Sequence, residues 1–221
     1  MVFQKDGSVT AELAVQFDQY MRQYAGLYEE LAEKTKEYMP SFSREPVVID
    51  VGAGPGLFSV VLHERVPAAW LLGVDLSRSM LQLAERNNRE AGVFRFIPVQ
   101  GRAEHLPFRE NSVDVVVCRF SLLYWQTPVD GCREIHRVLR PGGRVVIESL
   151  NARLSGWRQW MMLRQMGLHG AKRRVILYQK NAYERAFTVS DVEGFLVDAG
   201  FSVIQKEGES RDWKFLVVAE K

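Results

Sequence analysis

The sequence predicts an α/β fold in which a mostly parallel, seven-stranded sheet has helices on both faces. Two observations support this prediction. Apolar, β-branched runs alternate with helix-length segments after Pro46, and both faces of these runs are apolar, as in parallel strands that are covered on both sides. In addition, a chain of 221 residues, 47% of them hydrophobic, suits a single domain with one core.

The expected strands follow one another along the chain. Five apolar runs come after Pro46, and two more β-rich runs lie close to the C-terminus. The five runs are residues 47–51, 70–74, 93–97, 113–118 and 144–148, and the two later runs are residues 201–205 and 213–218.

Helices are expected between these runs and before them. Large apolar residues recur at three- and four-residue steps over residues 10–39, which indicates one or two amphipathic helices. The further helix signals are Ser77 at the start of residues 77–91, Pro141-Gly142-Gly143 at the end of residues 129–139, and a capping box from Thr188 to Asp191 before a last helix that ends at Ala199-Gly200.

Composition argues against several classes of protein. Cys118 and Cys132 have neither the spacing of a zinc site nor that of a disulfide framework, so no metal is expected. No apolar run approaches the ~18 residues of a membrane-spanning helix, and the N-terminus lacks the apolar region of a secretory signal. We therefore expect a soluble, cytoplasmic protein.

Charge is distributed unevenly along the chain. The net charge is +2, but residues 151–187 hold eight basic residues and one acidic residue, so this segment carries +7 and the remainder carries −5. Large apolar side chains such as Trp157 and Trp160 lie among these cations. The pattern indicates an anionic partner at one place on the molecule.

The strongest functional signal is a glycine-rich turn. The apolar run 47–51 leads into Gly52-x-Gly54-x-Gly56, and a helix is expected to begin near Leu57. Glycines let the backbone approach a bound ligand, and the start of the helix offers free N–H groups. Asp50 stands two residues before the first glycine, and the third glycine comes one residue earlier than in the dinucleotide fingerprint Gly-x-Gly-x-x-Gly.

This pattern resembles the first motif of class I S-adenosylmethionine-dependent methyltransferases. Three further stretches resemble the same family in the same order, namely residues 101–108, 113–125 and 134–145. The resemblance is strong over residues 46–150 and rests on pattern alone over the last 35 residues. Within the family, the chain is similar to the branch of ubiquinone, menaquinone and small-molecule methyltransferases (methyltransferase type 11-like). The resemblance implies the Rossmann-like class I methyltransferase fold.

The resemblance also implies S-adenosylmethionine as the cofactor. Asp75 would accept hydrogen bonds from both ribose hydroxyls, although a turn residue that caps the helix after Ser77 is the simpler reading. Arg119 and Ser121 should face the cofactor, because α/β sites open at the carboxyl ends of strands. The implied cofactor-binding set is Asp50, Gly52, Ala53, Gly54, Gly56, Asp75, Leu76, Met80, Arg102, Ala103, Glu104, Arg119 and Ser121.

Arg102 departs from the family pattern. The family usually has aspartate at this position, where it accepts a hydrogen bond from the adenine amino group, and a guanidinium has no acceptor. We expect the adenine contact to be remade by the Ala103 backbone and by Glu104 or a water molecule. Arg102 itself would stack on the adenine or point to solvent.

Residues for the chemical step are less well defined. The methyl donor in this family is already activated, so the protein contributes mainly by orienting the reactants and excluding water. Tyr124, His169 and Tyr183 are the candidates for removing a proton from the acceptor.

The chain is expected to form a single methyltransferase domain with four parts. Residues 1–45 are a helical extension, residues 46–150 the cofactor-binding core, residues 151–187 an inserted substrate cap, and residues 188–221 the last helix with a C-terminal strand pair. For the basic insertion, the alternatives to a cap are a solvated helical hairpin and an amphipathic surface that makes transient contact with a membrane.

The expected activity is methyl transfer to a small-molecule acceptor that is apolar and anionic. Two alternatives stay open at this stage. An RNA-modifying methyltransferase would use the basic segment and its tryptophans, but the acidic remainder and the absence of an Asn/Asp-Pro-Pro-Tyr motif argue against it. A non-catalytic partner protein that binds S-adenosylmethionine would explain the departure at Arg102.

The variant Arg102→Asp tests whether adenine recognition has moved elsewhere. We expect it to bind S-adenosylhomocysteine as well as the wild type or better, as measured by calorimetric titration. A loss of more than about tenfold, or ~1.4 kcal/mol, would mean that the arginine itself is a necessary contact.

Overall fold

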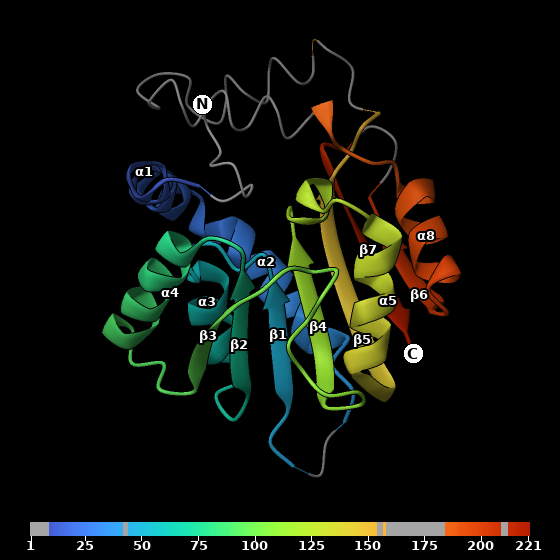
Figure 1. The fold of residues 1–221 in the computed structure, drawn as a ribbon, viewed down its shortest axis with the longest axis horizontal. Coiled ribbons are helices and arrows are strands. Elements are labelled where there is room, and N and C mark those ends of the chain that lie inside the picture. The colour runs from blue at the N-terminus through green and yellow to red at the C-terminus, as the bar shows by residue number, and fades with distance from the viewer. Residues whose placement is uncertain (1–8, 42–43, 154–156, 158–183, 209–211) are drawn as a thin grey trace.

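A seven-stranded sheet forms the centre of the computed structural model, which describes residues 9–41, 44–153, 157, 184–208 and 212–221 (Figure 1). The order of the strands across the sheet is β3-β2-β1-β4-β5-β7-β6. The strands are β1 (Val47–Val51), β2 (Trp70–Asp75), β3 (Phe96–Gln100), β4 (Val113–Arg119), β5 (Leu139–Leu150), β6 (Ser202–Glu207) and β7 (Lys214–Glu220).

The sheet is mostly parallel, as the sequence predicts. Strands β1 to β5 pair in parallel, whereas β7 runs antiparallel to β5 and to β6. The carboxyl ends of the five parallel strands therefore meet at one edge, where α/β proteins build their sites. This arrangement agrees with the Rossmann-like class I methyltransferase fold that the sequence resemblance implies.

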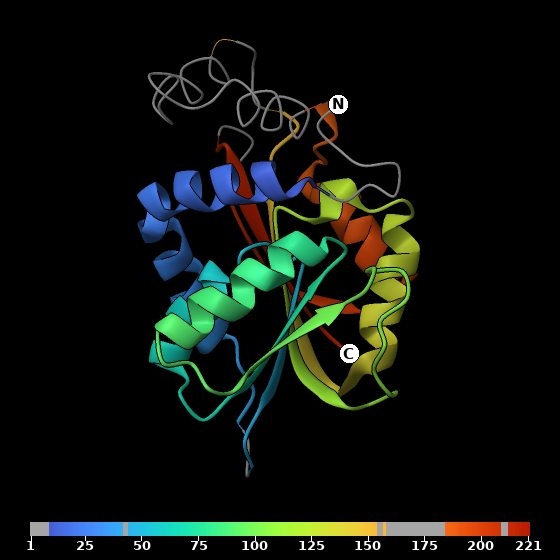
Figure 2. The ribbon, with the colours of Figure 1, turned by 60° about the vertical axis from the view of Figure 1, so that its left-hand side comes forward.

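Helices cover both faces of the sheet, in two layers (Figure 2). One layer packs on the face that includes Val48 and Val115, and the other packs on the face that includes Ile49 and Val116. The first layer consists of α1 (Ala11–Met21), α2 (Ala25–Glu37), α3 (Leu57–Arg65) and α4 (Arg78–Glu90), and the second of α5 (Pro128–Val138) and α8 (Val189–Asp198). Short 3₁₀ turns, η1 (Arg22–Tyr24) and η2 (Leu122–Tyr124), follow α1 and β4.

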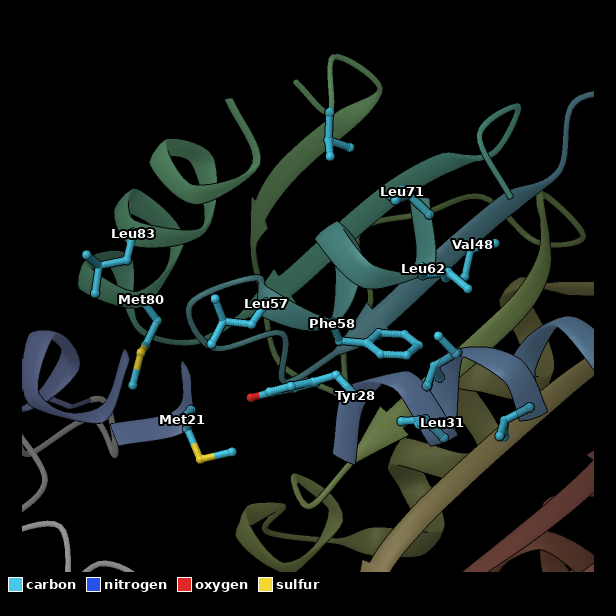
Figure 3. Close-up of a cluster of buried hydrophobic side chains, with 14 of the residues drawn as sticks. Met21, Tyr28, Leu31, Val48, Leu57, Phe58, Leu62, Leu71, Met80 and Leu83 are labelled. Atoms are coloured by element: carbon cyan, nitrogen blue, oxygen red, sulfur yellow. The ribbon is translucent and has the colours of Figure 1, made fainter. Parts of the chain in front are cut away.

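The N-terminal helices are part of the main core. Leu31 of α2 and Leu62 of α3 are each 1% exposed, and Figure 3 shows them on the side of α3 where Phe58 also lies. Burial of a leucine side chain contributes about 1.5 to 3 kcal/mol. The expected helical extension therefore stabilises the domain directly.

Two helix starts confirm the expected caps. Ser77 accepts a hydrogen bond from the Met80 N–H at the start of α4. Thr188 and Asp191 form a reciprocal capping box at the start of α8, and Gly200 ends that region with φ of 97°.

The third strand begins later than the sequence predicts. Residues 93–97 were the expected strand, but β3 spans Phe96–Gln100. Gly92 has a positive φ of 76°, and the Val93 N–H donates to the Asn88 carbonyl, so Val93 closes α4 instead of starting a strand. Pro98 is tolerated within β3 because this strand lies at the edge of the sheet.

Helix α5 ends at Val138, one residue before the expected end at residue 139, and Pro141-Gly142-Gly143 follows it within the first part of β5. Strand β5 thus begins five residues earlier than the expected run 144–148, because Leu139 pairs with Val113 of β4. The pairing of β4 with β5 has an irregularity between Val113 and Val115, which accommodates the glycines within β5.

No helix in the described part of the chain combines the length and apolar character that crossing a membrane would require.

Candidate functional site

The turn after β1 has a backbone that favours glycine. Gly52, Gly54 and Gly56 have φ values of 82°, 53° and 71°, in the left-handed region that other residues rarely adopt. Two of these glycines also lie against neighbouring atoms. A Cβ on Gly52 would be 2.2 Å from the Cβ of Ser121, and one on Gly56 would be 2.9 Å from the Cα of Ala84. The turn is thus packed tightly between β4 and α4.

Gly54 differs from the other two glycines because it borders open space. Apart from its two chain neighbours, no atom of the described residues would lie within 4 Å of a Cβ at this position. Its N–H donates to a carboxylate oxygen of Asp75, with 2.9 Å between the nitrogen and the oxygen. The middle of the turn therefore leaves room for a ligand to approach the backbone.

Asp75 ends β2 directly beside this open space. Its Oδ2 accepts from the Gly54 N–H, and its Oδ1 accepts from the Ser77 N–H at 2.8 Å. Desolvation raises the pKa of Asp75, although both hydrogen bonds oppose the rise. A carboxylate has about four lone-pair positions, so Asp75 can accept further hydrogen bonds from a ligand. Both its proposed roles, the cap and the acceptor, are therefore compatible.

Asp50 lies next to Asp75 but is much more deeply buried. Only 6% of Asp50 is exposed. Burial and, to a smaller extent, the negative charge of Asp75 raise the pKa of Asp50 to about 7, although the positive charge of Arg119 opposes the rise. The site therefore holds a carboxyl group that is only partly ionised near neutral pH.

Arg119 ends β4 on the other side of β1. Its Cζ lies 4.4 Å from the ring centroids of both Tyr28 and Phe120, and its Nε lies 2.9 Å from Oε2 of Glu148. Phe120 has a positive φ of 52°, a conformation held in part by the hydrogen bond from its N–H to the Glu148 carbonyl. The side chain of Arg119 therefore lies against α2, over the ring of Tyr28.

Comparison with known proteins relates this region to a family. The sequence profile of a family described as "Methyltransferase domain" matches residues 49–147, which include most of β1, all of β2, β3 and β4, and the glycine turn. This match, which spans slightly less than half of the chain, makes the region similar to that family.

Curated methyltransferases are also similar to about half of the chain. The demethylmenaquinone methyltransferase of Listeria welshimeri is 32% identical over 114 residues, which are 51% of this chain and 48% of the relative. The chain thus spans about half the length of the curated relatives it matches.

Solved structures extend the likeness to most of the chain. A protein from Methanococcus maripaludis is 25% identical, with a TM-score of 0.71 over 96% of this chain and 93% of the other. A S-adenosylmethionine-dependent methyltransferase from Aquifex aeolicus shares the fold at 20% identity, with a TM-score of 0.65 over 85% of this chain and 88% of the other.

A glutamate side chain holds the loop after β3 against the start of α5. Glu104 Oε1 accepts from the N–H groups of Gln126 and Thr127, at 2.6 and 3.3 Å, just before α5 begins. The other Glu104 oxygen lies 3.8 Å from Nε of Arg102, whose side chain is 38% exposed. Glu104 therefore has a structural partner in addition to any role at the adenine, and Arg102 is half-exposed.

The remaining predicted residues lie in different surroundings. Ser121 Oγ donates to the Val51 carbonyl, so it fastens the end of β1 to β4. Ala103 is buried, and the Leu76 carbonyl accepts from Gln100 Nε2 at 3.1 Å. Met80 is 4% exposed and packs within the core on the α1 side, as Figure 3 shows.

Of the three candidate bases, only Tyr124 lies among the described residues. It belongs to η2, directly after β4, and packs beside Leu123 and Leu150. His169 and Tyr183 lie outside the described residues, as does most of the expected cap, residues 151–187.

Sequence reasoning missed a polar network that supports the turn. Asn87 Nδ2 of α4 donates to the Pro55 carbonyl at 2.8 Å and to Oδ1 of Asp18 at 2.9 Å, and Arg22 donates to Asn87 Oδ1 at 2.7 Å. Ser77 Oγ also donates to the Val9 carbonyl. Polar residues at buried positions of α1 and α4 were the available signal, since Asp18 and Asn87 are each 4% exposed.

No group of three or more histidine, cysteine, aspartate or glutamate residues suited to a metal ion occurs within the described ranges of the chain.

The raised pKa of Asp50 makes the stability of the domain depend on pH. This carboxyl group binds its proton more tightly in the folded chain, so the free energy of unfolding should fall as pH rises from about 4 to about 7. A shift of this size corresponds to a loss on the order of 4 kcal/mol. Urea unfolding across this range measures the slope.

The variant Asp50→Asn removes this titration and should have a flatter profile, whereas Asp198→Asn on the exposed end of α8 should keep the wild-type slope. Parallel profiles for the wild type and Asp50→Asn would contradict the assignment.

Proposed function

We propose that this chain is an S-adenosylmethionine-dependent methyltransferase that acts on a small-molecule acceptor. One observation supports the proposal above all. The open backbone at Gly54 and the carboxylate of Asp75 face the same space, at the carboxyl ends of two adjacent parallel strands. This is where a nucleoside-bearing ligand finds both backbone contact and a hydroxyl acceptor in α/β folds.

The site fits the cofactor in shape and in chemistry. Asp75 would hold the ribose hydroxyls, Gly54 would leave space for the amino-acid chain attached to the sulfur, and Asp50 would pair with the ammonium group of that chain. When bound, S-adenosylmethionine supplies a methyl group on a positively charged sulfur. The protein's own contribution is to orient the acceptor and keep water out, which requires no strong base.

The apolar side chains beside this site would suit an apolar acceptor. Leu123 and Leu150 form a buried cluster at the ends of β4 and β5, with Phe120, Tyr124, Phe187 and Trp213 packed against it. The curated relatives are named for demethylmenaquinone, an apolar acceptor, which supports the same class for this chain. Because residues 151–187 hold a surplus of basic residues, we expect the acceptor to carry an anionic group as well.

The two ends of the segment 151–187 lie side by side. Asn151 and Phe187 form a parallel bridge, and the Ala152 N–H donates to the Phe187 carbonyl at 3.1 Å. Both ends of residues 151–187 therefore lie beside the apolar cluster. We assign the selection of the acceptor to this segment.

We also propose a cytoplasmic location, because Cys118 and Cys132 are both buried, free thiols. Burial raises the pKa of Cys118 to about 11 and that of Cys132 to about 12, so neither thiol is a nucleophile at neutral pH.

Transfer of a labelled methyl group tests the proposed activity. The full chain is incubated with methyl-labelled S-adenosylmethionine and either a pool of apolar small molecules or an RNA pool. We expect the label in the small-molecule pool. Label in RNA would favour the RNA-modifying alternative, and cofactor binding without transfer to either pool would favour the non-catalytic one.

A second variant separates acceptor selection from cofactor binding. Residues 153–186 are replaced by a short glycine-serine linker, which the Asn151–Phe187 bridge allows to close without strain. Affinity for S-adenosylhomocysteine should stay within a few fold while methyl transfer is lost. Retained turnover, or lost binding in a variant that melts cooperatively, would overturn the role assigned to the segment.

A further inference from the structure

The guanidinium of Arg119 has hydrogen-bonding capacity that the described residues do not use. Its side chain is 7% exposed, yet neither Nε nor Nη2 has a hydrogen-bond partner among the described residues. Glu148 Oε2 lies 2.9 Å from Nε, but it too lacks a hydrogen bond of acceptable geometry. Buried donors of this kind are costly unless a ligand or water satisfies them.

The carboxylates around Arg119 are shared with a second cation. Glu148 Oε1 contacts Lys214 Nζ at 2.6 Å, and Lys214 also pairs with Glu30 at 2.7 Å. Asp50, a further nearby carboxyl group, is only partly ionised near neutral pH. The donors at Nε and Nη2 of Arg119 that the described residues leave unused can therefore bind one further acceptor.

The order of strands places Arg119 at a defined distance from the ribose acceptor. Strand β1 lies between β2 and β4, so Asp75 and Arg119 end strands that are two inter-strand spacings apart, roughly 10 Å. Asp50 lies on the strand between them and interacts electrostatically with both. A hydroxyl acceptor, an anion and a cation therefore follow one another along this edge of the sheet.

This sequence of groups matches the nucleoside and amino-acid ends of one ligand. We propose that Arg119 binds the carboxylate at the amino-acid end of the cofactor and so makes the site select donors that carry that group. The inference rests on the proposed function, since it requires that S-adenosylmethionine occupies the site. The guanidinium provides a charged, planar pair of donors, and the rings of Tyr28 and Phe120 fix its plane.

A purely structural role for Arg119 makes a different prediction. An arginine that only joins β4, β5 and α2 would change stability, and its loss would weaken every ligand of the site alike. A carboxylate-binding arginine affects only ligands that carry the carboxylate. Two ligands that differ in this group therefore separate the two roles.

The test is calorimetric titration of the full chain with S-adenosylhomocysteine and with 5′-methylthioadenosine, which lacks the amino-acid end. The variant Arg119→Gln should lose about 10- to 100-fold in affinity for S-adenosylhomocysteine, as expected for charge-assisted hydrogen bonds. Its affinity for 5′-methylthioadenosine should stay within about threefold of the wild type. Arg119→Lys keeps the charge but loses the planar pair of guanidinium donors. Its affinity for S-adenosylhomocysteine should therefore lie between those of the wild type and Arg119→Gln.

Arg140→Gln is the matched control, because Arg140 pairs with buried Asp114 near the amino end of β4, away from the site. It should leave both affinities unchanged. Equal losses for both ligands in a folded Arg119→Gln variant would overturn the proposal, as would an unchanged affinity for S-adenosylhomocysteine combined with a raised KM for the acceptor. If neither ligand binds the wild type, the proposed function fails instead.

A measurement on the wild type covers the case in which both Arg119 variants fail to fold. Decarboxylated S-adenosylmethionine differs from the cofactor only in the missing carboxylate. We expect it to bind about 10- to 100-fold more weakly. Equal affinities would overturn the proposal without any substitution.

Discussion

The close packing of the turn between β1 and α3 is the constraint on which the rest of the site depends. Gly52 lies against Ser121 and Gly56 against Ala84, at distances that leave no room for a Cβ. This packing brings the end of β1 against β4 and against α4, and leaves only the middle of the turn, at Gly54, open. Asp75 then accepts a hydrogen bond directly from the Gly54 N–H. The carboxylate that would accept a ligand's hydroxyl groups therefore lies beside the space that the ligand would fill.

The N-terminal helices extend this constraint to the whole domain. Asn87 connects the carbonyl of Pro55, inside the turn, to Asp18 of α1, and both polar side chains are buried. Buried networks of this kind are costly if one partner is lost. Tyr28 of α2 in turn stacks on Arg119 at the end of β4. The helices before β1 therefore support the site from the side opposite α5, although they lie outside the matched region 49–147.

The sequence predicts the fold and the cofactor half of the site well, because both depend on local patterns. Apolar runs identify β1, β2, β4, β6 and β7 to within two residues at each end, and the Ser77 and Thr188 caps are local as well. The expected limits of β3 and β5 differ by up to five residues from those observed, because pairing with β2 and with Val113, respectively, decides these limits. The roles of Asn87 and Glu148 depend on partners distant in sequence, which no local pattern reveals.

The central claim is that a ribose-bearing cofactor binds at Asp75, and calorimetric titration of Asp75→Ala with S-adenosylhomocysteine tests it most directly. Asp198→Ala, at the exposed end of α8, serves as the control, and cooperative melting confirms that both variants fold. Loss of the hydroxyl acceptor should cost on the order of 1 to 3 kcal/mol, or about five- to 150-fold in affinity, in Asp75→Ala alone. An affinity equal to that of the wild type would contradict the account.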